Sequence, residues 1–193
     1  MNLSDRMIAF VHRWATGPAG RRWPVSVVGM LTFLAMCVVV IWGSTRVDVL
    51  IGIRVTAFST LRQIFGWPLV AFGFILIYWT LIFFFRERGT PFPLNPPRNL
   101  ITSGPYGITR NPMLGGWFIA FFGIGLLLGS ITLFLVATPL LIAIFTTFIT
   151  RIEEPELQIR FGEEYIEYTK RVPRFFPGTS RLRGEGNKTW RER

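Results

Sequence analysis

The chain has 193 residues, of which 50% are apolar and only 17% are charged, and its mean hydropathy is +0.42. Soluble domains carry about 25% charged residues. Because charge-free runs alternate here with charged segments, the composition excludes an ordinary soluble domain and indicates a membrane protein.

The formal net charge is +10. Nucleic-acid binding is one explanation for such a basic chain, but we find no nucleic-acid-binding motif. Topology and attraction to anionic headgroups explain the charge better, so we expect no nucleic-acid partner. The single cysteine, Cys37, excludes an internal disulfide, and the single histidine, His12, argues against a zinc site. We therefore expect no bound metal.

Residues 1–24 begin with an amphipathic stretch, 3–16, that predicts an interfacial helix on the cytoplasmic leaflet. The charge-free runs 25–45 and 66–85 match the roughly 20 residues of a membrane span. The first run is too long and starts too late to be a cleaved signal peptide. Residues 49–64 suggest a second interfacial or partly inserted helix on the far side, because Arg54 and Arg62 disfavour a full span. Residues 25–85 thus form the first two spans and their connection.

Residues 111–150 form an apolar block of about two span lengths, and Gly129-Ser130 divides it into a helical hairpin. The total is four transmembrane helices in an all-α integral membrane protein. Eighteen Lys and Arg residues fall on one side of this topology and three on the other. The positive-inside rule then places both termini in the cytoplasm.

Between the second span and the hairpin, residues 86–113 contain six prolines. Proline removes backbone donors and favours extended backbone before it. This loop is either an inert spacer or a functional element, and its length favours function.

Residues 151–177 predict a cytoplasmic helix with one apolar stripe, formed by Leu157, Phe161, Tyr165, Tyr168 and Val172. Residues 178–193 are predicted to be a disordered basic tail. Glu153 and Glu154 lie four and three residues before Leu157, on the side of the apolar stripe, where the fourth span leaves the membrane. Pro155 follows and should kink or restart the helix.

The two carboxylates repel each other and lose solvation at this boundary. They are either an interfacial pair neutralised by Arg151 or water, or a site for hydroxyl groups, a cation or a proton. A complementary anion site is predicted at the start of the third span. Asn111 is a predicted N-cap before Pro112, and a capped helix start beside Arg110 binds anions. The carboxylate pair and this anion site should lie at the same membrane face, and together they suit a zwitterionic ligand.

Two glycine clusters border this region. Gly115 and Gly116 allow a close approach of another backbone or a ligand. The "GIG" at 123–125 lies inside a span, so small-residue helix packing is a better interpretation than a nucleotide loop.

"GPYGITRNPMLGG" followed by "EEPELQIRFGEEYIEYTKRVPRFFP" resembles the integral-membrane methyltransferases that include isoprenylcysteine carboxyl methyltransferases and phosphatidylethanolamine N-methyltransferases. The resemblance covers roughly residues 86–177, the expected catalytic core. The loop "GTPFPLNPPRNL" is similar to that of bacterial members, which suggests a bacterial inner membrane.

The resemblance implies an enzyme that binds S-adenosylmethionine near the cytoplasmic face, under the loop and the C-terminal helix, and methylates a lipid-like substrate. It implies a cofactor site formed by Gly104, Pro105, Tyr106, Arg110, Asn111, Pro112, Gly116, Glu153, Glu154, Tyr165, Tyr168, Arg171 and Arg174. Glu153 and Arg110 are the catalytic candidates, with Glu153 able to accept a proton from an amine.

Two departures from the family pattern concern the substrate. Carboxyl methyltransferases usually have His at the position of Asn111, and an aromatic residue often stands where this chain has Leu114. An isoprenylcysteine substrate is therefore disfavoured. Two alternatives remain: an NADPH-dependent membrane reductase of the sterol-reductase type, and a non-catalytic membrane protein on the same fold.

Overall fold

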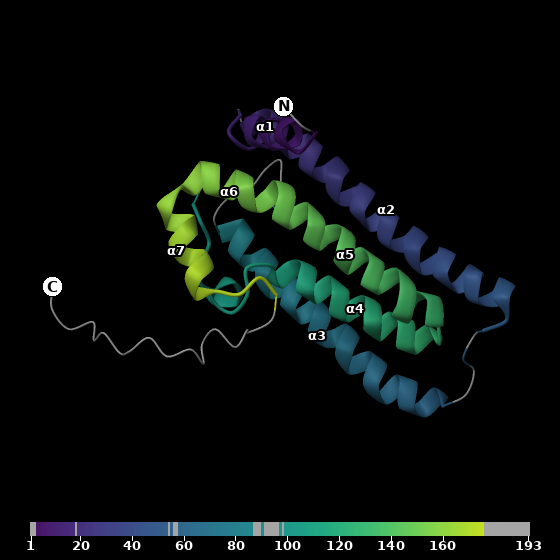
Figure 1. The fold of residues 1–193 in the computed structure, drawn as a ribbon. Coiled ribbons are helices and arrows are strands. Elements are labelled where there is room, and N and C mark those ends of the chain that lie inside the picture. The colour runs from purple at the N-terminus through teal and green to yellow at the C-terminus, as the bar shows by residue number, and fades with distance from the viewer. Residues whose placement is uncertain are drawn as a thin grey trace, which may run out of the picture.

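The computed structural model describes residues 3–17, 19–53, 55, 58–86, 90, 97 and 99–175. Within this part of the chain every regular element is helical, and there is no strand. The elements are α1 Leu3–Ala15, α2 Ala19–Ile51, α3 Ser59–Arg86, η1 Gly104–Gly107, α4 Pro112–Leu128, η2 Thr132–Ala137, α5 Thr138–Phe148, η3 Ile149–Glu153, α6 Glu154–Phe161 and α7 Glu163–Arg171 (Figure 1).

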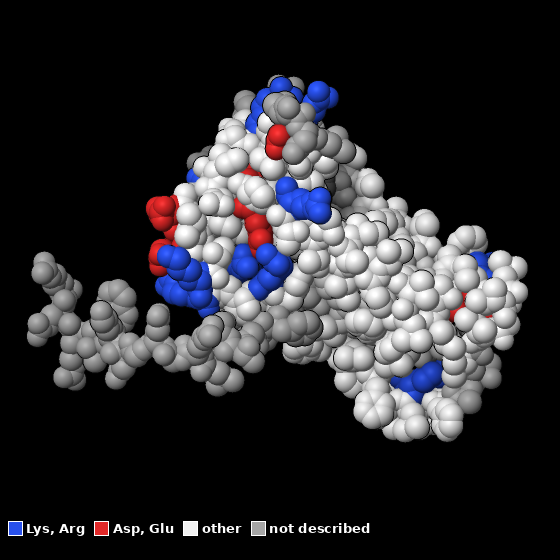
Figure 2. All heavy atoms as spheres, viewed as in Figure 1, with Lys and Arg blue, Asp and Glu red and all other residues white. Residues whose placement is uncertain are grey.

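Three helical stretches of the described chain are long and apolar enough to cross a membrane: Pro24–Ile51, Ser59–Arg86 and Thr132–Phe161. A fourth apolar helix, Pro112–Leu128, is shorter at 17 residues. Charged side chains gather towards the ends of the molecule and leave a broad uncharged zone between them (Figure 2). The described part of the chain is therefore all-helical, with three to four helices able to span a membrane, in line with the predicted all-α membrane class.

The helices α3 and α4 pack closely because glycines face each other along their contact. A Cβ built on Gly73 would lie 2.5 Å from the Gly116 carbonyl oxygen, and one on Gly123 would lie 2.8 Å from the Gly66 carbonyl oxygen. No side chain fits at these positions, so the backbones themselves are in contact. Gly123 of the "GIG" sequence is thus a helix-packing residue, as predicted.

The predicted hairpin turn is also confirmed. Gly129 ends α4 with φ of 63°, a left-handed conformation that glycine adopts without a Cβ penalty. Beyond it, the fully buried Asp48 of α2 accepts hydrogen bonds from the Ser130 hydroxyl and from the Thr132 backbone N–H, the latter at 2.9 Å. Asp48 therefore accepts the hydrogen bonds of donor groups at the start of η2 and links α2 to the hairpin.

Pro155 lies in the first turn of α6, where the π-helical segment η3 ends and a new α-helical segment begins, in line with the expected restart. The π-helical segment η3 leads directly into α6, just as η2 comes before α5 and Pro139. A proline ring collides with the carbonyl group four residues back in an α-helix. The wider π turn before each proline accommodates this conflict.

The predicted interfacial helix at 49–64 is wrong. α2 continues to Ile51 and α3 begins at Ser59, so the two ends of this stretch belong to the spanning helices. Gly52, with φ of 69°, ends α2. Arg54 lies outside the described residues, whereas Arg62 donates a hydrogen bond to the Val55 carbonyl oxygen. That bond gives the charged side chain a polar partner within a long apolar helix.

The C-terminal helix is two helices, because Gly162 takes φ of 56° and ψ of −130° between α6 and α7. The predicted apolar stripe nevertheless packs as one cluster: Tyr165, Tyr168 and Val172 are buried against Leu157 and Phe161, with Leu100 added. The predicted helix at 3–16 is present as α1, with Val11 and Ala15 buried. The tail at 178–193 and residues 87–89, 91–96 and 98 of the proline-rich loop lie outside the described residues.

Candidate functional site at the end of the hairpin

The segment at residues 104–111, which holds η1, is bound to the chain that follows α7. The Arg110 backbone N–H donates to the Pro173 carbonyl oxygen at 2.9 Å, and the Asn111 N–H donates to the Arg174 carbonyl oxygen at 3.2 Å. The Thr109 hydroxyl donates to that same Arg174 oxygen at 2.8 Å. The start of α4 and the end of the C-terminal segment are thereby fixed together.

A further bond holds the segment against α7: the Tyr168 hydroxyl donates to the Tyr106 carbonyl oxygen at 2.8 Å. Burial raises the pKa of the Tyr168 phenol, so the hydroxyl stays neutral and can donate at physiological pH. Gly104 has φ of 59°, and a Cβ there would collide with the Phe83 ring. Glycine is thus required where the segment crosses the end of α3.

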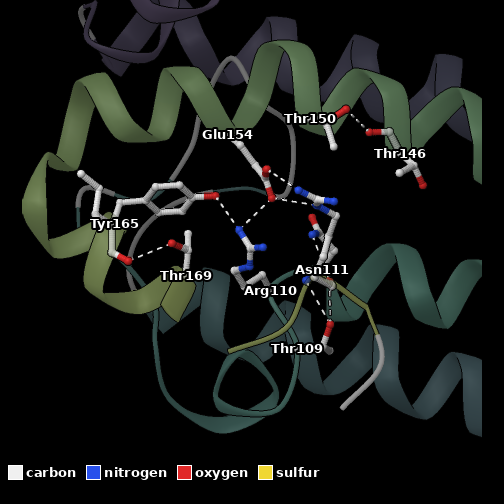
Figure 3. Close-up of polar contacts among 10 residues, drawn as sticks. Thr109, Arg110, Asn111, Thr146, Thr150, Glu154, Tyr165 and Thr169 are labelled. Carbon is white, nitrogen blue, oxygen red and sulfur yellow. Dashed lines mark hydrogen bonds and ion pairs between the residues drawn. The ribbon is translucent and has the colours of Figure 1, made fainter. Parts of the chain in front are cut away.

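Glu154 is the centre of an ion cluster (Figure 3). Arg110 Nη1 lies 2.7 Å from Glu154 Oε1, and Arg174 reaches both carboxylate oxygens through Nε at 2.9 Å and Nη2 at 2.8 Å. Arg110 Nη1 also donates to the Tyr165 hydroxyl at 3.4 Å. Bidentate guanidinium–carboxylate pairs are strong and well oriented. Two guanidinium groups share one carboxylate, so the cluster carries one net positive charge.

Glu153 differs from its neighbour. Its side chain is partly buried, and no hydrogen bond or ion pair joins its carboxylate to another described residue. The phenol of Tyr106 lies close to it: burial, and then the charge of Glu153, raise the pKa of Tyr106 well above its usual value. One of the two adjacent carboxylates is therefore doubly paired, whereas the other has no hydrogen bond or ion pair with another described residue.

Asn111 stands at the N-cap position of α4, but its side chain makes no capping hydrogen bond. The predicted capping role is therefore wrong. Its Nδ2 instead donates to the Arg174 carbonyl oxygen at 3.2 Å, because the backbone, with φ of −128° and ψ of 57°, is not in the extended conformation typical of a cap. Asn111 thus joins two segments rather than satisfying its own helix.

The other predicted site residues do not all lie in one region. Pro105 and Pro112 are fully buried and support the backbone. Gly116 faces α3, whereas a Cβ on Gly115 would meet nothing within 4 Å, so Gly115 is the glycine with open space beside it. Arg171 is exposed and its Nε reaches only the Glu167 carbonyl oxygen, at 3.4 Å. Gly104, Tyr106, Arg110, Asn111, Glu153, Glu154, Tyr165, Tyr168 and Arg174 do gather in one region.

Sequence reasoning missed Glu156, which is 3% exposed. Its carboxylate lies 3.3 Å from His12 Nδ1 of α1 and 3.4 Å from Arg160 Nε. The signal was present in "EEPE", because residues three apart share a helix face. Arg151, which one of the alternatives made a neutralising partner of the glutamates, is exposed, and Arg110 and Arg174 pair with Glu154 instead. Among the described residues, no three His, Cys, Asp or Glu residues gather into a potential metal site.

The sequence model of the phospholipid methyltransferase family matches residues 61–164. The cobalt-zinc-cadmium resistance protein CzcN of Cupriavidus metallidurans is 35% identical over 91 residues, which cover 47% of this chain and 40% of the relative. The protein-S-isoprenylcysteine O-methyltransferases of Xenopus laevis and Homo sapiens are 39% and 36% identical, over 40% of this chain and 27% of each relative.

The matched segment thus spans two fifths or less of these curated relatives. No solved structure matches the chain. The matched residues include α3, the hairpin and Glu153 and Glu154, which confirms the resemblance read from the sequence motifs. The family match covers more than half of the chain, and the chain belongs to the phospholipid methyltransferase family.

Proposed function

We propose that the protein transfers a methyl group from S-adenosylmethionine to a lipid-like acceptor, with both bound beside Glu153 and the Glu154 ion cluster. The observation that carries this proposal is the charge pattern. A cluster with one net positive charge, Arg110–Glu154–Arg174, lies next to Glu153, whose carboxyl group is joined to no other described residue by a hydrogen bond or ion pair and would carry the opposite charge beside a bound ammonium group. A zwitterionic amino-acid group complements such a pair of charges.

Two unsatisfied groups fit this cofactor. The Glu153 carboxylate suits an ammonium group, and Arg110 Nε is buried without a hydrogen-bond partner among the described residues, so it suits a carboxylate oxygen. Tyr106, Glu154, Tyr165, Tyr168 and Arg174 would hold these two groups in position. S-adenosylmethionine supplies an electrophilic methyl group on a sulfonium. The residues of this chain would then contribute mainly by positioning, which is worth roughly 7–11 kcal/mol in well-oriented reactions.

The surroundings support an apolar acceptor. Phe175, directly after Arg174, packs against Phe118 with 5.9 Å between ring centroids, and Phe118 lies 6.4 Å from the Phe145 ring. The ion cluster thus borders an aromatic cluster between the apolar helices. A lipid-like molecule could place its polar end beside Glu153 and its chain along these rings, and Glu153 could accept a proton from an amine.

The test is to incubate the purified protein and total membrane lipid with S-adenosylmethionine labelled in its methyl group. We expect label in a lipid fraction, and we expect Glu153→Gln to lose most of it. Glu163→Gln, an exposed position on α7, is the matched control and should keep full activity. An unlabelled lipid fraction together with no binding of S-adenosylhomocysteine would overturn the proposal, and tight NADPH binding would favour the reductase alternative.

A further inference from the structure

A groove lies between the N-terminal helix α1 and the last spanning helix. Its volume is about 510 Å³. Ser4 and Met7 of α1 line one wall, and Ile144, Phe148 and Arg151 line the other. None of the residues that line the groove belongs to the Glu154 cluster.

The groove changes from apolar to polar along α5. Ile144 and Phe148 are one helical turn apart and present hydrocarbon surface, with Ile144 53% exposed. Arg151 follows them at the end where α1 crosses and where charged residues gather (Figure 2). An amphipathic helix such as α1 lies in the headgroup region of a bilayer. The apolar wall would then meet acyl chains, and Arg151 would meet headgroups.

Arg151 is the charged group of the groove and is available to a ligand. It is exposed, and no hydrogen bond or ion pair joins its guanidinium to another described residue. Glu154 binds Arg110 and Arg174, and Glu156 binds His12 and Arg160, so neither of these carboxylates pairs with Arg151. The groove therefore offers an exposed arginine, not ion-paired to any described residue, at the end of an apolar wall.

We propose that this groove binds one anionic glycerophospholipid, with the phosphate on Arg151 and an acyl chain along Ile144 and Phe148. A guanidinium matches a phosphate through paired N–H donors. A free phosphate would leave the apolar wall uncovered, and an uncharged lipid would leave Arg151 without a counter-charge. The site is separate from the proposed methyl-transfer site, so it does not depend on that activity.

The experiment measures lipid retention by native mass spectrometry of the detergent-purified full chain, with phosphatidylglycerol and phosphatidylcholine as the two probes. The wild type should retain one phosphatidylglycerol in preference to phosphatidylcholine. Arg151→Gln should weaken that retention roughly fivefold or more, since one basic residue near an anionic surface contributes about this much. Ile144→Trp, which fills the groove without changing charge, should also weaken it.

The matched control is Arg13→Gln, an exposed arginine on α1 outside the groove, and it should retain lipid like the wild type. An unchanged melting temperature shows that each variant is folded. The proposal is overturned if Arg151→Gln retains phosphatidylglycerol normally, if Arg13→Gln loses it equally, or if phosphatidylcholine binds as well. A lipid-free dimer that Arg151→Gln dissociates would also overturn it, because a second copy would then cover the groove.

Discussion

Arg174 and Glu154 form two parallel hydrogen bonds, at 2.9 and 2.8 Å, across the turn between α6 and α7. Arg110 approaches the same carboxylate from the other side, at 2.7 Å. One carboxylate therefore joins the start of α4, the end of the spanning helix and the C-terminal segment. This junction explains why two motifs that are more than 40 residues apart in sequence form one site.

Glu154→Gln should destabilise the fold, because two guanidinium groups would then face each other without a counter-charge. We expect the free energy of unfolding to fall by about 2 kcal/mol, the cost of leaving partly buried charged partners unsatisfied. Thermal unfolding in detergent measures the change, with exposed Glu163→Gln as a control that should have no effect. An unchanged melting temperature for Glu154→Gln would show that the cluster contributes nothing to stability.

Glu153→Gln should weaken cofactor binding and leave the stability of the fold nearly unchanged. Because its carboxylate has no partner among the described residues, the melting temperature should change little. Binding of S-adenosylhomocysteine, measured by calorimetry, should weaken about tenfold, or about 1.4 kcal/mol. A normal affinity would mean that Glu153 does not contact the cofactor, whereas a large loss of stability would show a structural role instead.

Gly73→Ala should be strongly destabilising, since a Cβ there would lie 2.5 Å from the Gly116 carbonyl oxygen and 2.8 Å from the Ala120 nitrogen. Overpacking of this kind costs about 1–3 kcal/mol or more. Gly115→Ala is the matched control, because a Cβ there meets nothing within 4 Å. It should be neutral or stabilise α4 by about 0.5–1 kcal/mol. Equal melting temperatures for the two variants would contradict this packing.

The stability of the fold should decrease at alkaline pH. Burial and the nearby Glu154 charge raise the pKa of Tyr165 to about 12, above its unfolded value of about 10. The folded state therefore holds the phenolic proton more tightly, so this stabilisation is complete below pH about 10 and is lost as the pH rises towards about 12. Denaturant unfolding between these pH values measures the slope.

The control for this pH dependence is Tyr165→Phe, which cannot ionise at that position. Its free energy of unfolding should fall less steeply with pH over the same range. Absorbance of tyrosinate at 295 nm should rise later in the folded protein than in denatured protein. A wild-type slope identical to that of Tyr165→Phe would show that this phenol ionises normally in the folded state.

Asp48→Ala tests the opposite end of the bundle. The substitution leaves the Ser130 hydroxyl and the Thr132 backbone N–H without their shared acceptor. Each unsatisfied buried donor costs about 1–3 kcal/mol, so the melting temperature should drop clearly while the affinity for S-adenosylhomocysteine stays near normal. Exposed Glu164→Gln is a suitable control. A stable Asp48→Ala variant would mean that water replaces the carboxylate.

The sequence alone determined the membrane class, the approximate spans and the hairpin at Gly129, because apolar runs and a glycine turn are local properties of the chain. It also placed Tyr165, Tyr168 and Val172 in one cluster through their spacing, although Gly162 divides the helix that carries them. The family motifs around Asn111 and Glu153 are local too, and they could be recognised without a structure.

Tertiary structure alone decided how the polar groups pair. Asn111 could cap its own helix or bond elsewhere, and only the position of the Arg174 carbonyl group selects the second option. Glu153 and Glu154 are adjacent and chemically alike, yet Arg110 and Arg174 approach Glu154 alone. Partners of this kind come from distant segments, and the packing of α3 on α4 and of the C-terminal segment on residues 109–111 determines which carboxylate they reach.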